Sequence, residues 1–521
     1  MRTNKVRVFL WGDEVGSLMW DARQGCACFI FSPGYLRHGK NIFPLVHDIN
    51  GFSAMAPCFG SGDRMDRFGN LPPFIADYLP DGWGNQVFDD WAERNHVPAR
   101  DRTSIDKLSF IGRRGMGALE FVPEACIPDS LEAVAIGDLY RAAERLFSER
   151  EDAVLEASSD LALDLLYKVG TSAGGQRAKA IVAINEKDKS IRSGQVAGLD
   201  GYRYCILKFS EKGTFPSAEI EKTYSDMARL AGIDMTDCWM LPIEGRNHFV
   251  TERYDRPEGR KLHTLSLAAI TGGCSTCEGL FCAARKIPVP ERDITELYRR
   301  IVFNALSGNT DGHDRNYSFI MRPSGAWRVS PAYDMTFTYD IFRPGGTAQA
   351  MSMLGKRENI TISDLLEFAK QQNIRGAETI VRKVCSALMR WDELAERNGV
   401  FKNWRFYIGE YISRNLSEEF SERMIRFREE KFVPVKVDGL SVNDVEVSES
   451  QRGDMHLRVD VEGHTVRRVL SHKSEAALRI MKMGGAAASQ SDKVILFKDY
   501  ILPGVREHLR VESSREKKLK M

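Results

Sequence analysis

The fold of this 521-residue chain is decided by the stretch Asn309-Thr-Asp311-Gly-His-Asp-Arg-Asn316-Tyr-Ser-Phe, together with Pro331-Ala-Tyr-Asp334-Met. The stretch places an Asp five residues before an Asn, and a second Asp follows eighteen residues after that Asn. In such a pattern one Asp can accept the proton of a hydroxyl, while the Asn and the second Asp can hold metal ions against phosphate oxygens. Asp and Asn are also common turn residues, so this spacing needs support from the rest of the chain.

A glycine-rich segment upstream is the first support. Phosphoryl transfer depends on positioning and charge neutralisation, so it needs a backbone cradle for phosphates and a cation beside them. The predicted cradle is Gly170-Thr-Ser172-Ala-Gly174-Gly175, because glycines let successive N–H groups approach an anion closely. For this segment alone, an ordinary glycine turn between a helix and a strand is the more common explanation.

The predicted cation is Lys208, which lies in an apolar strand at 203–209. Glu221 follows thirteen residues later on a predicted helix and can pair with it. Two alternatives stay open at this point. Lys179 also lies near the cradle, and Glu219 lies on the same predicted helix as Glu221.

The end of the predicted strand at 248–254 is the candidate for the adenine side of the site, because it directly precedes the mainly helical half of the chain. Glu252 and Tyr254 lie there, and Tyr254 can pack on the base, although a solvent-exposed strand end is the alternative. His313 can orient the acceptor or a phosphate, or it can be a hydrogen-bonded structural residue. Cradle, lysine, glutamate and the Asp-Asn-Asp pattern occur in kinase order, which predicts an ATP-dependent phosphotransferase with Asp311 as its base.

Composition describes a globular protein without a dominant charge. Hydrophobic residues make up 43% and charged residues 28%, and the net charge is +1, so nothing global points to nucleic acid or acidic lipid. No apolar run reaches the roughly 18 residues that span a bilayer, and the first residues are expected to form a strand rather than a signal peptide. Cys274, Cys277 and Cys282 lack a second pair at zinc-finger spacing, so no zinc is expected there. We expect a cytoplasmic protein that does not associate with membranes.

The first part of the chain is predicted to be β-rich and contains two glycine-rich passages, at 79–84 and 111–121. Their glycines are expected to serve tight turns and close backbone approaches. Phosphate binding by Arg113 and Arg114 is the less favoured alternative. The predicted domain boundaries are 1–125, 126–260, 261–434 and 435–521.

Seven segments carry a resemblance to a known family, and they occur in family order over about residues 5–430. They are Leu79-Pro-Asp-Gly-Trp-Gly, Gly112-Arg-Arg-Gly-Met-Gly-Ala-Leu, Ser172-Ala-Gly-Gly-Gln-Arg-Ala-Lys, Ile206-Leu-Lys-Phe, Glu252-Arg-Tyr-Asp-Arg, Asn309-Thr-Asp-Gly-His-Asp-Arg-Asn-Tyr-Ser and Ala332-Tyr-Asp. Together they are specific. The chain resembles HipA-type serine/threonine kinases, the toxin halves of bacterial toxin–antitoxin pairs.

The resemblance implies an α+β fold: a bilobal protein-kinase-like core with an N-terminal β-rich subdomain, a mainly helical C-lobe and, in this chain, a small α/β C-terminal extension. It also implies ATP and Mg²⁺. Ser172 matches the loop serine that such kinases autophosphorylate, and a phosphate there would add negative charge beside the ATP phosphates. The other implied roles are Asp311 as catalytic base, Asn316 and Asp334 as metal ligands, Lys208 as the phosphate-contacting lysine, and Glu252 and Tyr254 as adenine-side residues.

Partners are likewise implied by the resemblance. Family members use a small helix-turn-helix antitoxin that binds operator DNA, and their targets include an aminoacyl-tRNA synthetase. Two other hypotheses stay open: a small-molecule kinase on the same scaffold, and a catalytically weak corepressor that binds DNA with its antitoxin. Both kinase hypotheses require Asp311 and Asp334.

The tail at 435–521 departs from the family because it is longer than the family core needs. It is expected to combine polar turns at 441–453, an alternating strand from His456 and a helix at 474–482. It lacks a helix-turn-helix pattern, so a fused antitoxin is not expected.

Overall fold

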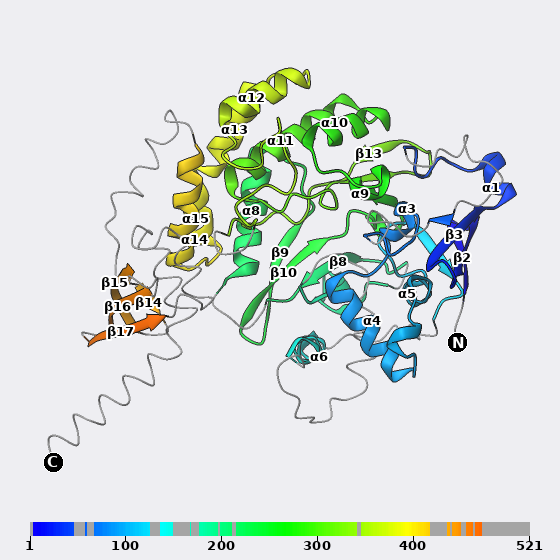
Figure 1. Cartoon of the computed structure of the whole chain (residues 1–521), viewed down its shortest axis with the longest axis horizontal. Helices are drawn as coiled ribbons and strands as arrows, with labels where there is room; N and C mark the ends of the chain where they lie inside the picture. The colour runs from blue at the N-terminus through cyan, green and yellow to red at the C-terminus, as the bar shows by residue number, and fades with distance from the viewer. Residues whose placement is uncertain are drawn as a thin grey trace, which may run out of the picture.

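The computed structural model describes residues 4–45, 58–59, 67–125, 136–148, 167, 177–195, 198–210, 215–340, 345–416, 435–437, 440–449, 455–461 and 464–470. The predicted cradle residues Ser172, Gly174 and Gly175 lie outside the described residues, as does the tail helix predicted at 474–482. The described part is a mixed α/β protein whose strands form four antiparallel sheets (Figure 1).

The first sheet belongs to the blue end of the chain in Figure 1. Its strands are β1 (Lys5–Leu10), β2 (Asp13–Asp21), β3 (Cys26–Phe31), β4 (Cys58–Phe59) and β5 (Leu119–Val122), in the order β4-β3-β2-β1-β5. Along β1, Val6, Val8 and Leu10 are buried whereas Lys5 and Arg7 are exposed, as expected of a strand with one face on a core. The accompanying helices are α1 (Pro33–His38), α3 (Pro73–Ala76), α4 (Gly82–Arg94), η2 (Ala99–Asp101) and α5 (Ser104–Ile111). We call the described residues of 4–125 the N-terminal unit.

The second sheet carries Lys208 at the end of one of its strands. Its strands are β6 (Lys179–Asn185), β7 (Ile191–Ser193), β8 (Tyr202–Lys208), β9 (Cys238–Ile243) and β10 (Arg246–Glu252), in the order β7-β6-β8-β10-β9. Helix α6 (Ile136–Ser148) precedes the sheet in the chain, and α8 (Ser217–Ala231) packs against β9 and β10. Gly232 ends α8 in the left-handed conformation with φ 85°.

The third sheet is small and is surrounded by helices. Its strands are β11 (His263–Ser266), β12 (Ser318–Met321) and β13 (Trp327–Val329). The helices of this part are η3 (Pro257–Gly259), α9 (Leu267–Thr271), α10 (Cys277–Lys286), α11 (Glu291–Ser307), α12 (Ile362–Gln371), α13 (Ala377–Leu388), α14 (Trp391–Arg397) and α15 (Lys402–Asn415). This part is mainly helical, as expected, and the antiparallel pair of β12 and β13 interrupts the helices.

The N-terminal unit and the helical part share one hydrophobic core. Helix α3 contacts α9, and buried residues from β1 through α15 form a continuous cluster. A second cluster joins Trp83 and Val87 of α4 to Ala180 of β6 and Leu207 of β8. The N-terminal unit therefore packs against both the second sheet and the helical part.

The tail contains a four-stranded antiparallel sheet, drawn in orange in Figure 1. Its strands are β14 (Val435–Val437), β15 (Leu440–Glu449), β16 (Met455–Val461) and β17 (His464–Leu470). The prediction of polar turns at 441–453 is wrong, since most of that segment is β15. The register of β15 shifts between Val442 and Asp444, and this irregularity breaks the alternation that would have indicated a strand.

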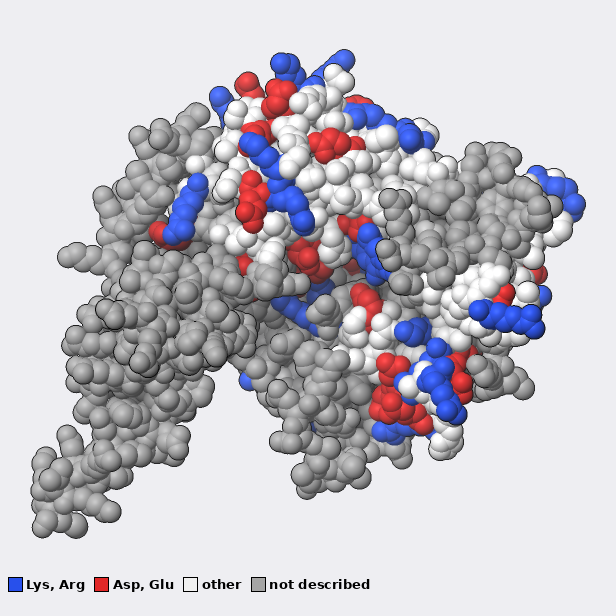
Figure 2. All heavy atoms as spheres, in the orientation of Figure 1, with Lys and Arg blue, Asp and Glu red and all other residues white. Residues whose placement is uncertain are grey.

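On the face shown in Figure 2, described Lys and Arg side chains alternate with Asp and Glu side chains over the surface. This distribution agrees with the net charge of +1. None of the helices in the described ranges is long and apolar enough to cross a membrane.

Candidate active site

Three charged residues from distant parts of the chain meet at one point. Lys208, the last residue of β8, places its Nζ 2.5 Å from Oε1 of Glu221 on α8 and 2.5 Å from Oδ1 of Asp334, which follows β13. The Glu221 side chain is only 3% exposed, so its position is defined by packing. Lys208 thus joins the second sheet to the segment that carries the third residue of the Asp-Asn-Asp pattern.

The charges of this triad stabilise one another. Burial by itself would lower the pKa of Lys208, but Asp334 and Glu221 outweigh it and raise that pKa above its usual range. In turn Lys208 is the main cause that holds the pKa of Asp334 well below its usual range. Two acidic side chains therefore face one ammonium, and Arg177 Nη1 lies 3.8 Å from Glu221 Oε2 as a second cation.

The two alternatives to this triad occupy other positions. Glu219 accepts a hydrogen bond of 2.9 Å from Asn247 Nδ2 and does not pair with Lys208. Lys179 lies directly opposite Lys208 in the register of β6 and β8. Burial lowers the pKa of Lys179 to about 8, against the opposing charge of Asp81. Lys179 is thus a second buried lysine on the same sheet, with its backbone carbonyl accepting the indole N–H of Trp83 at 2.9 Å.

The loop that carries Asp311 begins where α11 ends. Gly308 has φ 80°, and a Cβ there would lie 2.7 Å from the Phe337 ring, so a glycine is required at this turn. Asn316 Nδ2 donates to the backbone oxygen of Asp311 at 2.7 Å. Thr338 Oγ1 accepts the Asp311 N–H at 3.1 Å, as it does the preceding N–H at 2.7 Å. The backbone of Asp311 is therefore held from two sides, while its carboxylate is half-exposed.

His313 lies beside Asp311. Its Nδ1 accepts the backbone N–H of Arg315 at 3.2 Å, so in the neutral ring the proton is on Nε2. Nε2 lies 4.0 Å from Asp311 Oδ2. His313 is therefore hydrogen-bonded within the loop, as expected of a structural residue. It also lies half-exposed next to Asp311, so its role in orienting the acceptor or a phosphate stays a prediction.

Asp334 is held in a strained backbone conformation, with φ 55°. A non-glycine residue in the left-handed region costs free energy and is concentrated at functional sites. The neighbouring Tyr333 stabilises this conformation, because its hydroxyl donates to the backbone oxygen of Arg315 at 2.7 Å and lies 2.6 Å from Ser318 Oγ. The Asp334 segment is thereby tied to the Asp311 loop.

The two predicted adenine-side residues lie at and just after the end of β10. Tyr254 stacks on Tyr333 with ring centroids 5.6 Å apart and an interplanar angle of 25°. Glu252 Oε2 accepts a hydrogen bond of 2.8 Å from Arg203 Nη2. Both side chains have protein partners, and Tyr254 lies beside the Asp334 segment through its contact with Tyr333. Contact of Glu252 and Tyr254 with an adenine base stays a prediction.

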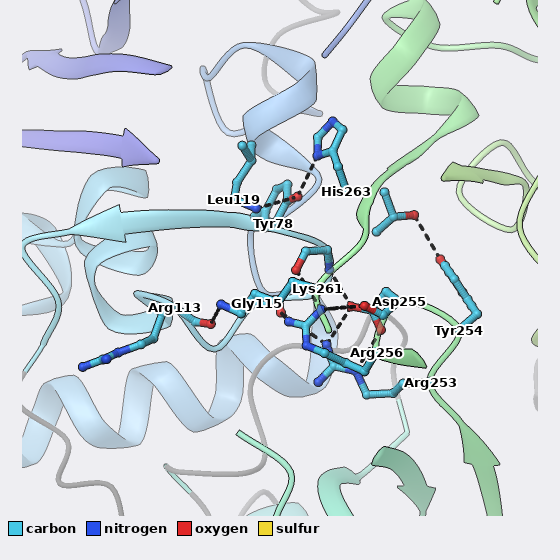
Figure 3. Close-up of polar contacts among 12 residues, drawn as sticks. Tyr78, Arg113, Gly115, Leu119, Arg253, Tyr254, Asp255, Arg256, Lys261 and His263 are labelled. Atoms are coloured by element: carbon cyan, nitrogen blue, oxygen red, sulfur yellow. Dashed lines mark hydrogen bonds and ion pairs between the residues drawn. The ribbon is translucent and has the colours of Figure 1, made fainter. Parts of the chain in front are cut away.

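Sequence reasoning missed a buried ion cluster directly after these residues (Figure 3). Asp255 Oδ2 lies 2.8 Å from Arg253 Nη2, 2.6 Å from Arg256 Nη1 and 2.7 Å from the backbone nitrogen of Gly117. Arg256 Nη2 also donates to the Gly115 oxygen at 2.8 Å. The cluster fastens the segment between the second sheet and the helical part to the glycine loop of the N-terminal unit. The motif Glu252-Arg-Tyr-Asp-Arg drew attention to this segment, but not to its acidic centre.

This cluster explains the glycines at 111–121. Gly117 has φ 79°, and a Cβ there would lie 2.4 Å from the Tyr78 hydroxyl, which confirms the prediction of a close backbone approach. Arg114 is buried, and its guanidinium donates to backbone oxygens, including that of Tyr167 at 3.1 Å. Arg113 pairs with Glu124 at 2.9 Å. Phosphate binding by these two arginines is therefore not supported.

Asn316 and Asp334 have the chemistry of Mg²⁺ ligands. They line one small pocket together, and Mg²⁺ prefers oxygen donors that it shares with waters and phosphates. Asn316 uses its Nδ2 on the Asp311 carbonyl, so its amide oxygen is the group that can bind a cation. Within the part of the chain that the structure describes, no three His, Cys, Asp or Glu side chains form a metal cluster.

Comparisons with known proteins cover most of the chain. Residues 6–122 match the HipA N-terminal domain family, and residues 171–391 match the HipA-like C-terminal domain family. A putative kinase, Y4mE, of Sinorhizobium fredii is 25% identical over 407 residues, which are 74% of this chain and 89% of the relative. The serine/threonine-protein kinase toxin HipA of Shewanella oneidensis is 31% identical over 121 residues, which are 20% of this chain and 28% of the relative.

A solved structure shows the same fold at lower sequence identity. It is the HipA chain of a complex of Shewanella oneidensis HipA, HipB and their operator DNA. The superposition has a TM-score of 0.55 at 17% identity and covers 82% of this chain and 100% of that chain.

Proposed function

We propose, from the premise that this chain belongs to the HipA-type family, that it is an ATP-dependent protein serine/threonine kinase and the toxin component of a toxin–antitoxin pair. The observation that carries the proposal is the triad of Lys208, Glu221 and Asp334, which meets beside the loop of Asp311 and Asn316. In a bilobal kinase-like arrangement, β8 supplies Lys208 and α8 supplies Glu221. The helical part supplies Asp311, Asn316 and Asp334.

In this mechanism each residue has a defined task. An ammonium has three N–H donors; Lys208 directs two of them to Glu221 and Asp334, and the third can bind a phosphate oxygen. Asn316 and Asp334 would hold Mg²⁺, whose charge neutralises the phosphates of ATP. Asp311 accepts the proton of the acceptor hydroxyl as its oxygen bonds to the γ-phosphorus and ADP leaves.

The remaining predicted residues complete the nucleotide site in this proposal. Ser172, Gly174 and Gly175 form the phosphate cradle, and Glu252 and Tyr254 lie on the adenine side. Ser172 is also the proposed autophosphorylation site, because a phosphoserine would bring about −1.5 to −2 charges beside the ATP phosphates and oppose nucleotide binding.

The proposed partners follow from the family. The solved relative was crystallised with HipB and operator DNA, and we infer a helix-turn-helix antitoxin for this chain, through which it reaches DNA. The proposed substrate class is a cytoplasmic protein of translation, such as an aminoacyl-tRNA synthetase. The half-exposed Asp311 carboxylate is compatible with a hydroxyl presented by a large protein substrate.

The test is incubation of the purified full-length chain with Mg²⁺ and ATP, beside the Asp311→Asn variant. We expect phosphate on Ser172 by mass spectrometry in the wild type and none in the variant. Phosphoproteomics of cells that express the two proteins would then identify the substrate. Turnover of ATP only upon addition of small metabolites, with Ser172 unmodified, would favour a small-molecule kinase. A protein that neither binds nor hydrolyses ATP, and whose cellular effect survives Asp311→Ala, would be a corepressor instead.

A further inference from the structure

An ion pair connects the N-terminal unit to the loop of Asp311. Arg67 Nη2 lies 2.6 Å from Oδ1 and 2.6 Å from Oδ2 of Asp314, although the two residues are 247 positions apart in the chain. Asp314 is buried, with 5% of its side chain exposed, whereas the Arg67 side chain is 44% exposed. The arginine therefore approaches from the surface of the N-terminal unit and closes over a buried carboxylate.

Asp314 is bound to the rest of the molecule at two further points, and the next residue adds a third contact. Its Oδ2 accepts the backbone N–H of Cys274 at 2.8 Å, and its backbone oxygen accepts that of Ala268 at 3.1 Å. Its neighbour Arg315 donates from Nη2 to the backbone oxygen of Arg67 at 3.3 Å. The Asp314 carboxylate therefore has one partner in the helical part and one charged partner in the N-terminal unit.

Asp314 lies in the chain between the predicted base and the predicted metal ligand, three residues after Asp311 and two before Asn316. Thr338 anchors the loop at Asp311, and the Arg67–Asp314 pair anchors it in the middle. We propose that Arg67 is a positioning residue, through which the N-terminal unit holds the loop of residues 309–316 in the geometry that phosphoryl transfer requires. The catalytic part of this proposal rests on the proposed function.

The physical reason is the sensitivity of transfer reactions to position. Misplacement of a reacting group by about 1 Å can cost about 100-fold in rate. When Arg67 is lost, the buried Asp314 carboxylate keeps the hydrogen bond from the backbone N–H of Cys274 but has lost its charged partner. Lys208 and Glu221 are held by separate contacts, so ATP binding should change little.

The experiment compares Arg67→Met, Arg67→Lys and Arg102→Met in the full-length chain. Arg102 belongs to the same unit and pairs with Asp89 at 2.9 Å, so Arg102→Met is a matched control for the loss of an ion pair. We expect kcat to fall about 10- to 100-fold in Arg67→Met with KM for ATP within about 3-fold, and Arg67→Lys to recover part of the loss, because its charge is kept but the planar fork is lost. Arg102→Met should keep the wild-type kcat.

Hydrogen exchange supplies a readout that needs no activity. Backbone amides of 309–316 should exchange faster in Arg67→Met than in the wild type or in Arg102→Met. Unchanged exchange there, or a wild-type kcat in Arg67→Met, would overturn the positioning role. If the wild type lacks phosphotransfer but the exchange difference is found, the proposed function fails while the contact between unit and loop stands.

Discussion

Replacement of Asp255 by asparagine should destabilise the protein strongly, because it removes the carboxylate at the centre of a buried cluster of two arginines. The Asp255 side chain is fully buried and accepts from Arg253, Arg256 and the Gly117 N–H. Burial by itself would raise the pKa of Asp255, but Arg253 and Arg256 outweigh it and lower that pKa to about 2.

The magnitude follows from two independent arguments. The difference between the ordinary pKa of 3.8 and the lowered value of about 2 corresponds to about 2–3 kcal/mol at about 1.4 kcal/mol per pKa unit. Breaking a buried ion pair from one side costs about 3–5 kcal/mol, since the remaining charges stay buried. We therefore expect Asp255→Asn to lose about 3–5 kcal/mol of unfolding free energy at pH 7.

The assay is urea unfolding followed by tryptophan fluorescence, with Glu258→Gln as the control. Glu258 lies three residues away in an ion pair with Arg260 whose side chains are 79% and 76% exposed, so its loss should have little effect. A carboxylate with a lowered pKa stabilises the fold above its unfolded pKa, and that stabilisation is lost as the pH falls from about 4 to about 2. Asp255→Asn should therefore also flatten the stability profile in this acid range. Equal stability of the two variants at pH 7 would refute the reasoning.

Three further predictions concern the active site. Lys208→Met should abolish autophosphorylation at Ser172 with the fold retained, as judged by circular dichroism; phosphate on Ser172 in this variant would exclude the assigned role of Lys208. Thr338→Val leaves the Asp311 N–H without its acceptor and should lower kcat about 10-fold, whereas Thr338→Ser should keep it; equal rates for both would show that the hydroxyl does not position the loop. Lys179 loses its charge as the pH rises through about 8, so ATP affinity by calorimetry should fall between pH 7 and 9, and Lys179→Arg should remove this dependence; a flat wild-type profile would contradict it.

Secondary structure near the candidate site could be predicted from local patterns in the sequence. The helix α8 has apolar residues at helical spacing and a glycine after its last turn, and both features act within one element. The same kind of reasoning failed for β15, where a register shift between Val442 and Asp444 interrupts the alternation. An irregularity of this kind depends on the partner strand and leaves little trace in the local sequence.

The choice between neighbouring candidates needed the tertiary structure. Glu219 and Glu221 are two residues apart on a helix, so their side chains point about 200° apart around its axis, and only one can face Lys208. The spacing of apolar residues along the helix is compatible with either glutamate facing Lys208. The packing of α8 on β10 directs Glu221 to Lys208 and Glu219 to Asn247.

The sequence by itself determined the order of the candidate chemical parts: a glycine-rich segment, a strand lysine, a helix glutamate and the Asp-Asn-Asp pattern. It could do so because each part is a short motif with its own residue preferences. The meeting of Lys208 with Asp334, of Arg67 with Asp314 and of Asp255 with the glycine loop was decided by the tertiary structure alone. These contacts join residues more than 100 positions apart, and a charged side chain in a loop carries no local signal of the partner that folding will bring to it.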